Sequence, residues 1–357
     1  MAPIFIFITA FVTVLISISA VNIYANIGQY FYKDDKLERR AATYIAEGKY
    51  VVGNAELKLP SLQTMLAQSF ARAPETIVFG SSRAMQVGAR EIGSGVTVFN
   101  HSVNTALLET HMGLFAIYDQ RGIYPSQIVI GVDPWIFKKF RIDTSFETYL
   151  EPLRRFTSTA GITMFDVQAP PTWRISNLFS VQRTVAAFKT LDTDHCSGIR
   201  AAQHEQSDCA VRRPDMTLRY PIEWRRRTAE EVSATVSLVV SRRGRMHGFD
   251  GFDSIDPGQV KRFQAFLRYL QKKNIQTVLL LVPYHPLVSN ILKDSFDWKL
   301  TMEVESRVKA LAASMRLPVY GSYNPVATKC GISDFFDEMH PRPRCLRKIY
   351  AGLKDGK

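Results

Sequence analysis

The chain has 357 residues, of which 46% are apolar and 22% are charged, which is enough for one large domain or two ordinary ones. This composition excludes disordered chains, collagen-like repeats and small disulfide scaffolds. Lys and Arg total 45 against 33 Asp and Glu, so the formal charge is +12. An excess of this size indicates contact with an anionic polymer or a membrane surface.

The first 32 residues predict a transmembrane anchor. Residues 2–32 carry no charged side chain and residues 4–25 are almost continuously apolar, which is longer than the roughly 20 residues that cross a bilayer. A cleavable signal peptide is the alternative, but the basic start and the A-x-A-like cleavage site are missing. The aromatic belt expected at the far end of the anchor contains Tyr24, Tyr30, Phe31 and Tyr32.

The four cysteines fall into two local pairs. Twelve residues separate Cys196 from Cys209, and fourteen separate Cys330 from Cys345. Neither gap has the spacing of two to four residues found in structural zinc sites, and we expect no metal or other cofactor. Two disulfides fit better, each stabilising the fold by about 3 kcal/mol; four reduced thiols are the alternative.

The two topology signals disagree. Residues 33–40 carry four positive and three negative side chains, a weak indication that the C-terminal part is cytoplasmic. Disulfides indicate the opposite side of the membrane, because they persist in oxidising compartments. We give the cysteines more weight and predict a single-pass protein of the cell inner membrane whose main domain is periplasmic.

Residues 33–72 are polar and predict a helical juxtamembrane stalk, broken at Gly53 and Pro60. Residues 73–357 then alternate short apolar runs with helical patterns. The expected strands are residues 76–79, 97–99, 127–132, 277–282 and 318–320. The expected helices contain residues 108–115, 256–274 and 304–315. This alternation predicts an α/β fold, a doubly wound, flavodoxin-like parallel sheet with helices on both faces.

Residues 138–250 interrupt the alternation and predict a basic insertion. Residues 138–245 contain 18 Lys and Arg against 12 Asp and Glu, which is +6 of the total +12. Its arginine runs at 225–227 and 242–245 are candidates for docking the phosphates of lipid headgroups or an anionic glycan. A solvated basic face is an equally good interpretation. We expect no nucleic acid partner, because no binding motif accompanies the charge.

Two short motifs carry the candidate chemistry. Gly80-Ser81-Ser82-Arg83 follows the first strand, which places a hydroxyl at the carboxyl edge of a parallel sheet, where such folds bind ligands. Near the other end, Asp337 and His340 form an Asp-x-x-His pair. This spacing lets the carboxylate fix the tautomer of the imidazole while the other ring nitrogen points at a serine.

The order of these motifs resembles the SGNH, or GDSL-like, hydrolase superfamily, which has its nucleophile in a Gly-Asp-Ser-type turn and an Asp-x-x-His near the C-terminus. The Gly-Ser-Ser-Arg turn, the N-terminal anchor and the strand end Val282-Pro283-Tyr284-His285-Pro286 are most similar to its DltD-like and alginate-acetylation-like branch. The resemblance covers residues 74–137 and 275–350. It implies that Ser82 is the nucleophile, His340 the general base and later acid, and Asp337 the orienting carboxylate.

The resemblance also implies an oxyanion hole, in which Ser102 would supply a backbone N–H. Asp133 stands where many relatives have an Asn donor, and an ionised carboxylate only accepts hydrogen bonds. Either Asp133 is structural or Asn104 supplies the missing donor.

Two further residues are candidate substrate contacts. Arg83 is predicted to hold an anionic acyl donor or acceptor, with a structural ion pair as the alternative. His285 is predicted to contact substrate, with a satisfied turn residue as the alternative. A bond between Cys330 and Cys345 would restrain the loop that carries the acid and the base.

The resemblance implies a membrane-anchored serine O-acyltransferase or esterase. It would move a small acyl group, acetyl or D-alanyl, to or from a cell-envelope polysaccharide or similar polymer through an acyl-Ser82 intermediate. The implied partners are a membrane-bound O-acyltransferase (MBOAT), an anionic cell-envelope polymer and the lipid bilayer. The alternative is a catalytically silent SGNH-like subunit that binds glycan or scaffolds the transferase complex, which Asp133 would favour.

Overall fold

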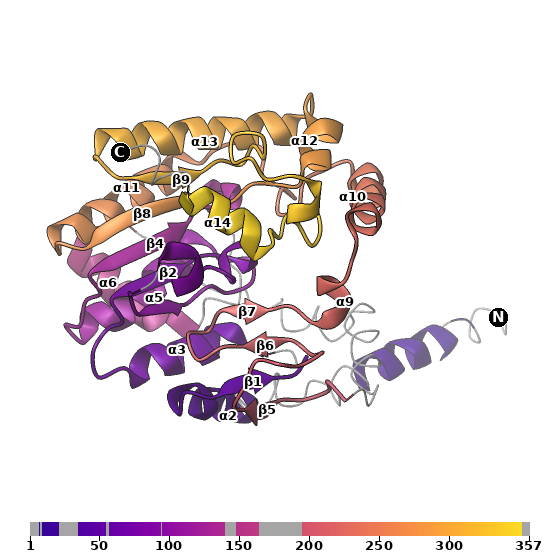
Figure 1. Cartoon of the computed structure of the whole chain (residues 1–357), viewed down its shortest axis with the longest axis horizontal. Helices are drawn as coiled ribbons and strands as arrows, with labels where there is room; N and C mark the ends of the chain where they lie inside the picture. The colour runs from indigo at the N-terminus through magenta and orange to yellow at the C-terminus, as the bar shows by residue number, and fades with distance from the viewer. Residues whose placement is uncertain are drawn as a thin grey trace.

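The computed structural model describes residues 7, 9–20, 35–54, 57–93, 95–139, 148–163 and 195–351 (Figure 1). The predicted anchor, residues 1–32, lies largely outside the described residues, although residues 9–20 are helical. The described residues include no helix with the length and apolar character that a bilayer crossing requires.

A five-stranded parallel sheet forms the centre of the molecule. Its strands are β2 (Thr76–Phe79), β3 (Val98–Asn100), β4 (Gln127–Gly131), β8 (Gln276–Leu281) and β9 (Val319–Gly321). They are arranged in the order β3-β2-β4-β8-β9, and all neighbouring strands are parallel. Numbered along the chain this order is 2-1-3-4-5, that of flavodoxin-like sheets. The five predicted strands are confirmed with their bounds shifted by at most one residue.

Helices cover both faces of this sheet, because strand residues alternate between two hydrophobic clusters. Ile77 and Phe79 pack in one cluster with four helices: α5 (Leu108–Gln120), α6 (Leu150–Ala160), α11 (Pro257–Lys272) and α13 (Phe296–Ser314). Val78 packs on the opposite face with two helices: α4 (Ala89–Ile92) and α14 (Pro343–Ala351). The doubly wound arrangement therefore follows from the apolar runs, in which both faces of each strand are buried.

The predicted stalk is wrong as a separate element, because most of it is part of the domain. It folds into α2 (Lys36–Ala46), β1 (Tyr50–Val52) and α3 (Leu59–Ser69). Leu62 and Leu66 of α3 pack in one cluster with Phe99 of β3, and burying this apolar face stabilises the helix against the body. The expected break at Gly53 is present, whereas Pro60 lies in the first turn of α3, where proline is well tolerated.

The basic insertion builds a second, antiparallel sheet next to the first. After α6 it contains β5 (Arg200–Ala202), β6 (Val211–Arg212) and β7 (Leu218–Arg219), followed by α9 (Ile222–Arg225) and α10 (Ala229–Arg243). The sheet order is β5-β1-β6-β7, so β1 from the predicted stalk lies between two strands of the insertion. The predicted Cys196–Cys209 disulfide is present and joins the segment before β5 to the segment before β6. A last helix, α12 (Pro286–Leu292), follows β8.

Candidate active site

A sharp turn after β2 carries the predicted nucleophile. A Cβ atom on Gly80 would lie 2.6 Å from the Ala84 Cβ and 3.2 Å from the Ser102 Oγ, so the turn has no room for a side chain there. Ser81 Oγ then accepts a hydrogen bond from the Arg83 amide and begins a single 3-10 turn, Ser82–Ala84. The turn lies between the ends of β2 and β4, where the strand order reverses and where folds of this class bind their ligands.

The three residues of the predicted triad lie within hydrogen-bonding distance of one another. His340 Nε2 is 2.8 Å from Ser82 Oγ, across 258 positions of sequence. His340 Nδ1 is 2.7 Å from Asp337 Oδ2. The second carboxylate oxygen of Asp337 accepts hydrogen bonds from the amides of Met339 and His340. Burial raises the pKa of Asp337, but the adjacent imidazole and these amides outweigh it and hold the pKa below its ordinary value.

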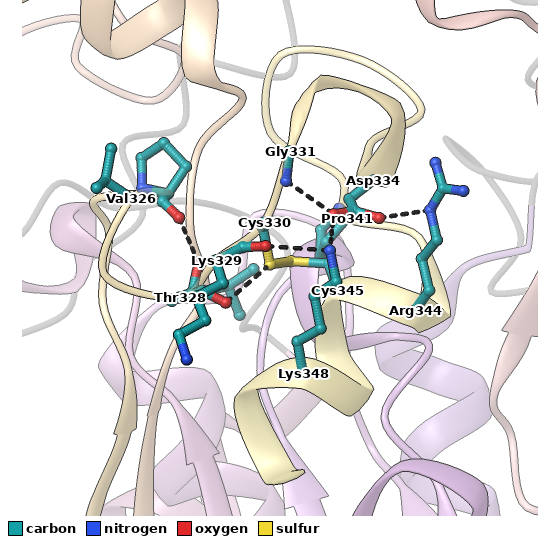
Figure 2. Close-up of a disulfide and its surroundings, with 12 residues drawn as sticks. Val326, Thr328, Lys329, Cys330, Gly331, Asp334, Pro341, Arg344, Cys345 and Lys348 are labelled. Atoms are coloured by element: carbon teal, nitrogen blue, oxygen red, sulfur yellow. Dashed lines mark hydrogen bonds and ion pairs between the residues drawn. A yellow bond between two sulfur atoms is a disulfide. The ribbon is translucent and has the colours of Figure 1, made fainter. Parts of the chain in front are cut away.

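The loop that carries Asp337 and His340 is closed by the second disulfide, Cys330–Cys345, as predicted. Figure 2 shows this bond beside Asp334, which accepts from the Gly331 amide at 2.7 Å and forms an ion pair with Arg344. Lys348 contacts the same carboxylate at 2.6 Å. The two arms of the loop are therefore joined covalently and by a buried carboxylate with several partners.

Arg83, the residue after the nucleophile, is buried and forms the structural ion pair that was the alternative prediction. It is 1% exposed, and its Nη1 lies 2.8 Å from Asp133 Oδ1. The rest of its guanidinium donates to the carbonyls of Val282 and Met339 and lies 4.0 Å from the ring centroid of Tyr284. The expectation that Arg83 holds an anionic substrate is wrong, because the guanidinium is buried and already hydrogen-bonded to groups of the protein.

Asp133 is the other half of this buried pair, and its position decides the question that the sequence left open. Burial raises the pKa of its carboxyl, whereas the Arg83 guanidinium and the Ser81 hydroxyl favour the charged form. The carboxylate accepts from Arg83 and is not available as an oxyanion donor. Asp133 is therefore structural.

The segment predicted to supply oxyanion donors is ordered by its own side chains. The Ser102 amide donates to Asn100 Oδ1 at 2.9 Å, and Asn100 Nδ2 donates to the carbonyls of Ala84 and Val87. This arrangement fixes the segment against the nucleophile turn but occupies the Ser102 N–H that the resemblance assigned to the oxyanion. Asn104, two residues further on, is exposed.

His285 lies at the start of α12 and is fully buried. Its Nδ1 accepts a hydrogen bond from the Leu287 amide at 3.1 Å, which caps the helix. Burial lowers its pKa to about 4, so the imidazole is neutral at physiological pH. The predicted substrate contact is wrong for so buried a side chain, and Nδ1 has the role of a turn residue, whereas the buried Nε2 has no hydrogen-bond partner among the described residues.

Sequence reasoning missed two aromatic residues that the insertion brings to the triad. The ring of Tyr220 lies 6.0 Å from that of His340, and the ring of Trp224 lies 6.4 Å from it. The two aromatic rings stack with centroids 5.1 Å apart and planes 3° from parallel. Their signal in the sequence is an aromatic pair four positions apart before the first arginine run, but nothing in the pattern indicates its place in space.

Several arginines of the two basic runs interact with other groups of the protein. Arg225 donates to the carbonyls of Tyr220 and Ser207, and the guanidinium of Arg227 lies 5.3 Å from the Trp224 ring centroid. In the second run, Arg245 pairs with Asp297 at 3.3 Å. Docking of these runs onto phosphates or glycan stays a prediction.

Within the described part of the chain, one group of side chains has the proximity of a metal site, His195 with Cys196 and Cys209. Both sulfurs belong to the disulfide, so the group lacks the thiolates that a zinc ion requires.

No protein-family model matches the chain, and no curated protein sequence matches it significantly. Among solved structures, it is similar to one described as "a putative platelet activating factor from Streptococcus pneumonia", at 8% sequence identity and a TM-score of 0.37, over 89% of this chain and 96% of the other. The fold assignment therefore rests on the strand order and helix layers of the chain itself.

Proposed function

We propose that the chain is a serine acyl-transfer enzyme with Ser82 as nucleophile. The observation that carries the proposal is the continuous Ser82–His340–Asp337 hydrogen-bonded relay at the point where the strand order reverses. A serine hydroxyl is a weak nucleophile on its own and needs an adjacent base that a third group orients. This relay supplies both groups.

The chemistry follows from the relay. Ser82 Oγ attacks the carbonyl carbon of an ester while His340 Nε2 takes its proton, and Asp337 stabilises the imidazolium that forms. The tetrahedral intermediate collapses, the leaving alkoxide takes the proton from His340, and an acyl-Ser82 ester remains. Water or a sugar hydroxyl then attacks this ester by the same steps in reverse order, giving hydrolysis or transfer. We propose Asn104 as the side-chain donor to the oxyanion.

The more specific role is membrane-anchored O-acyl transfer to a cell-envelope polymer. The apolar segment 1–32 supports the anchor, and the two disulfides support a domain outside the cytoplasm. The acetyl or D-alanyl group and the MBOAT partner come from the family resemblance of the Gly-Ser-Ser-Arg and Asp-x-x-His motifs. The alternative of a silent scaffold was favoured by Asp133, and that residue has a structural partner in Arg83.

The test is covalent labelling of the full chain with a fluorophosphonate probe, together with hydrolysis of p-nitrophenyl acetate. We expect labelling of the wild type, loss of labelling in Ser82→Ala, and a fall in kcat of about 10⁴-fold or more, as in other serine triads. Ser314→Ala, which removes an exposed hydroxyl at the end of α13, is the matched control and should retain both activities. Folded wild-type protein that takes no label would contradict the proposal.

A further inference from the structure

One arginine of the insertion, Arg212, has a half-buried side chain. Its Nη1 is shielded from solvent and has no hydrogen-bond partner among the described residues. Its neighbours differ, because Arg213 pairs with Glu205 at 2.6 Å and Arg219 donates to the carbonyls of Glu205 and Ser207. Burial lowers the pKa of Arg212 to about 10, so the group still carries its charge at neutral pH. A shielded nitrogen of a charged group that lacks a partner is costly, and a bound anion would supply that partner.

The register of the antiparallel sheet determines the direction of this side chain. Arg212 of β6 lies opposite Val51 of β1 and Leu218 of β7, and directly opposed residues share a face of the sheet. Val51 and Leu218 pack in the cluster that also contains Val103, in the segment after β3. Arg212 is therefore on the face of the insertion that covers the body of the protein, not on the outer face.

Tyr220 connects this arginine with the triad. Tyr220 comes two residues after Leu218, which lies opposite Arg212 in the sheet, and burial raises the pKa of the Tyr220 phenol, against the weaker, lowering effect of the charge of Arg212. The Tyr220 ring is 6.0 Å from the His340 ring and 4.8 Å from that of Phe336 in the same loop. None of the described residues accepts a hydrogen bond from the Tyr220 hydroxyl. Two donors without acceptors, one of them charged, thus lie on the insertion side of the site.

Arg342 connects the α9 part of the insertion to the catalytic loop. Arg342 lies two residues after His340, and its Nη1 and Nη2 each donate at 2.9 Å, to the carbonyls of Arg225 and Arg227. Its Nε donates to the Phe335 carbonyl. Arg342 therefore joins the end of α9 to the triad loop, on the side of the insertion where Tyr220 lies beside His340.

We propose that Arg212 and the Tyr220 hydroxyl form an anion-binding subsite of the active site, which receives a carboxylate or phosphate group of the acyl acceptor. A guanidinium presents paired donors that match such an anion. A neutral acceptor would leave the charge unpaired, so the subsite would select against it. That the anion belongs to an acyl acceptor rests on the proposed function, but binding of the anion at the subsite can be measured without turnover.

The experiment uses the full chain with Ser82→Ala, so that no acyl transfer occurs. Isothermal titration compares trigalacturonate, a glycerol phosphate trimer and neutral maltotriose. We expect at least one anionic trimer to bind 10-fold or more tightly than maltotriose, and the tighter of the two identifies carboxylate or phosphate as the recognised group. Adding Arg212→Met should reduce that affinity at least 10-fold. Adding Arg268→Gln, which removes an exposed charge from α11, outside both arginine runs, should change it less than twofold.

Stability of the unliganded protein provides a second readout. Because Arg212→Met removes a shielded charged nitrogen without a partner and nearly keeps the length of the side chain, we expect its urea midpoint to equal or exceed that of the parent. A fall in the midpoint would mean that Arg212 has a structural role and would overturn the proposal. Equal losses of affinity in Arg212→Met and Arg268→Gln, or no preference for an anionic trimer, would also overturn it. Fluorophosphonate labelling of the wild type reports on Ser82 separately, so the failure of one proposal is distinguishable from that of the other.

Discussion

The two segments that meet in the triad are held by different forces. The nucleophile turn, residues 80–87, is fixed from inside the protein, by the close packing of Gly80 and by the buried pair of Arg83 with Asp133. The catalytic loop, residues 330–345, is fixed nearer the surface, by a disulfide and by the partners of Asp334. Burial shields the first set from water and salt, whereas two of the cations around Asp334 are exposed.

Because the two segments are held differently, we expect them to respond differently to the loss of an ion-pair partner or of a disulfide. Removing one member of a buried ion pair is strongly destabilising, because the remaining charge is neither paired nor solvated. A loop closed by a covalent bond loses the restraint on its folded conformation, as well as that on its unfolded chain, when the bond is removed. We therefore expect substitutions in the nucleophile turn to lower the free energy of unfolding of the whole protein. In the catalytic loop, we expect them to disorder the loop locally. Three predictions test this comparison.

The largest expected effect is on catalysis, in the catalytic loop. Asp337→Asn retains the shape of the side chain but no longer holds His340 in the tautomer that accepts the Ser82 proton. We expect kcat for p-nitrophenyl acetate to fall by about 10⁴-fold, as in other triads with this change, while the urea midpoint changes little. Asp334→Asn is the matched control three positions earlier, and it should lower stability with a far smaller effect on kcat. A loss of less than 10-fold in Asp337→Asn would remove this carboxylate from the mechanism.

The second effect is on stability, in the nucleophile turn. Arg83→Met leaves the Asp133 carboxylate buried without its cation, and we expect a loss of about 3–5 kcal/mol in the free energy of unfolding. The double variant Arg83→Met/Asp133→Leu removes both charges, and it should recover most of this loss. Urea unfolding of the four proteins in this cycle measures the coupling. Additive losses in the double variant would show that the pair does not hold the turn.

Much of the central fold and the triad could be predicted from the sequence, because both depend on local patterns. Apolar runs marked the five strands, and the Asp-x-x-His spacing placed Asp337 beside His340 through hydrogen bonds inside one short segment. The position of Ser82 opposite His340 followed from a general rule of parallel sheets, since the carboxyl ends of the strands share one edge.

What could not be predicted depends on contacts between distant segments. The stalk appeared separate because β1 finds its partners β5 and β6 about 150 residues later, and no local pattern indicates this pairing. The role of Arg83 stayed open for the same reason, since its partners come from the ends of two other strands and from the catalytic loop. Tyr220 lies between β7 and α9, two short elements that leave no periodic pattern in the sequence, so only the fold reveals that it is near His340.

The smallest of the three effects concerns the two disulfides, and it distinguishes local from global order. Each closes a short segment, with separations of 13 and 15 residues, so removing either should lower stability by about 3 kcal/mol. The Cys330–Cys345 ring contains Asp337 and His340, whereas the Cys196–Cys209 ring contains neither. Cys330→Ser/Cys345→Ser should therefore also lower kcat for p-nitrophenyl acetate, because loosening the loop disorders the acid and the base.

The control for this prediction is Cys196→Ser/Cys209→Ser, which should show the same loss of urea stability with kcat near that of the wild type. Both variants are compared at a temperature and urea concentration where each remains folded, so that kcat reports on the native state alone. If the two variants lost kcat equally, the disulfide at the catalytic loop would act only through global stability. The catalytic loop would then be ordered by its internal hydrogen bonds and by the partners of Asp334, and its contrast with the nucleophile turn would be one of burial rather than of covalent restraint.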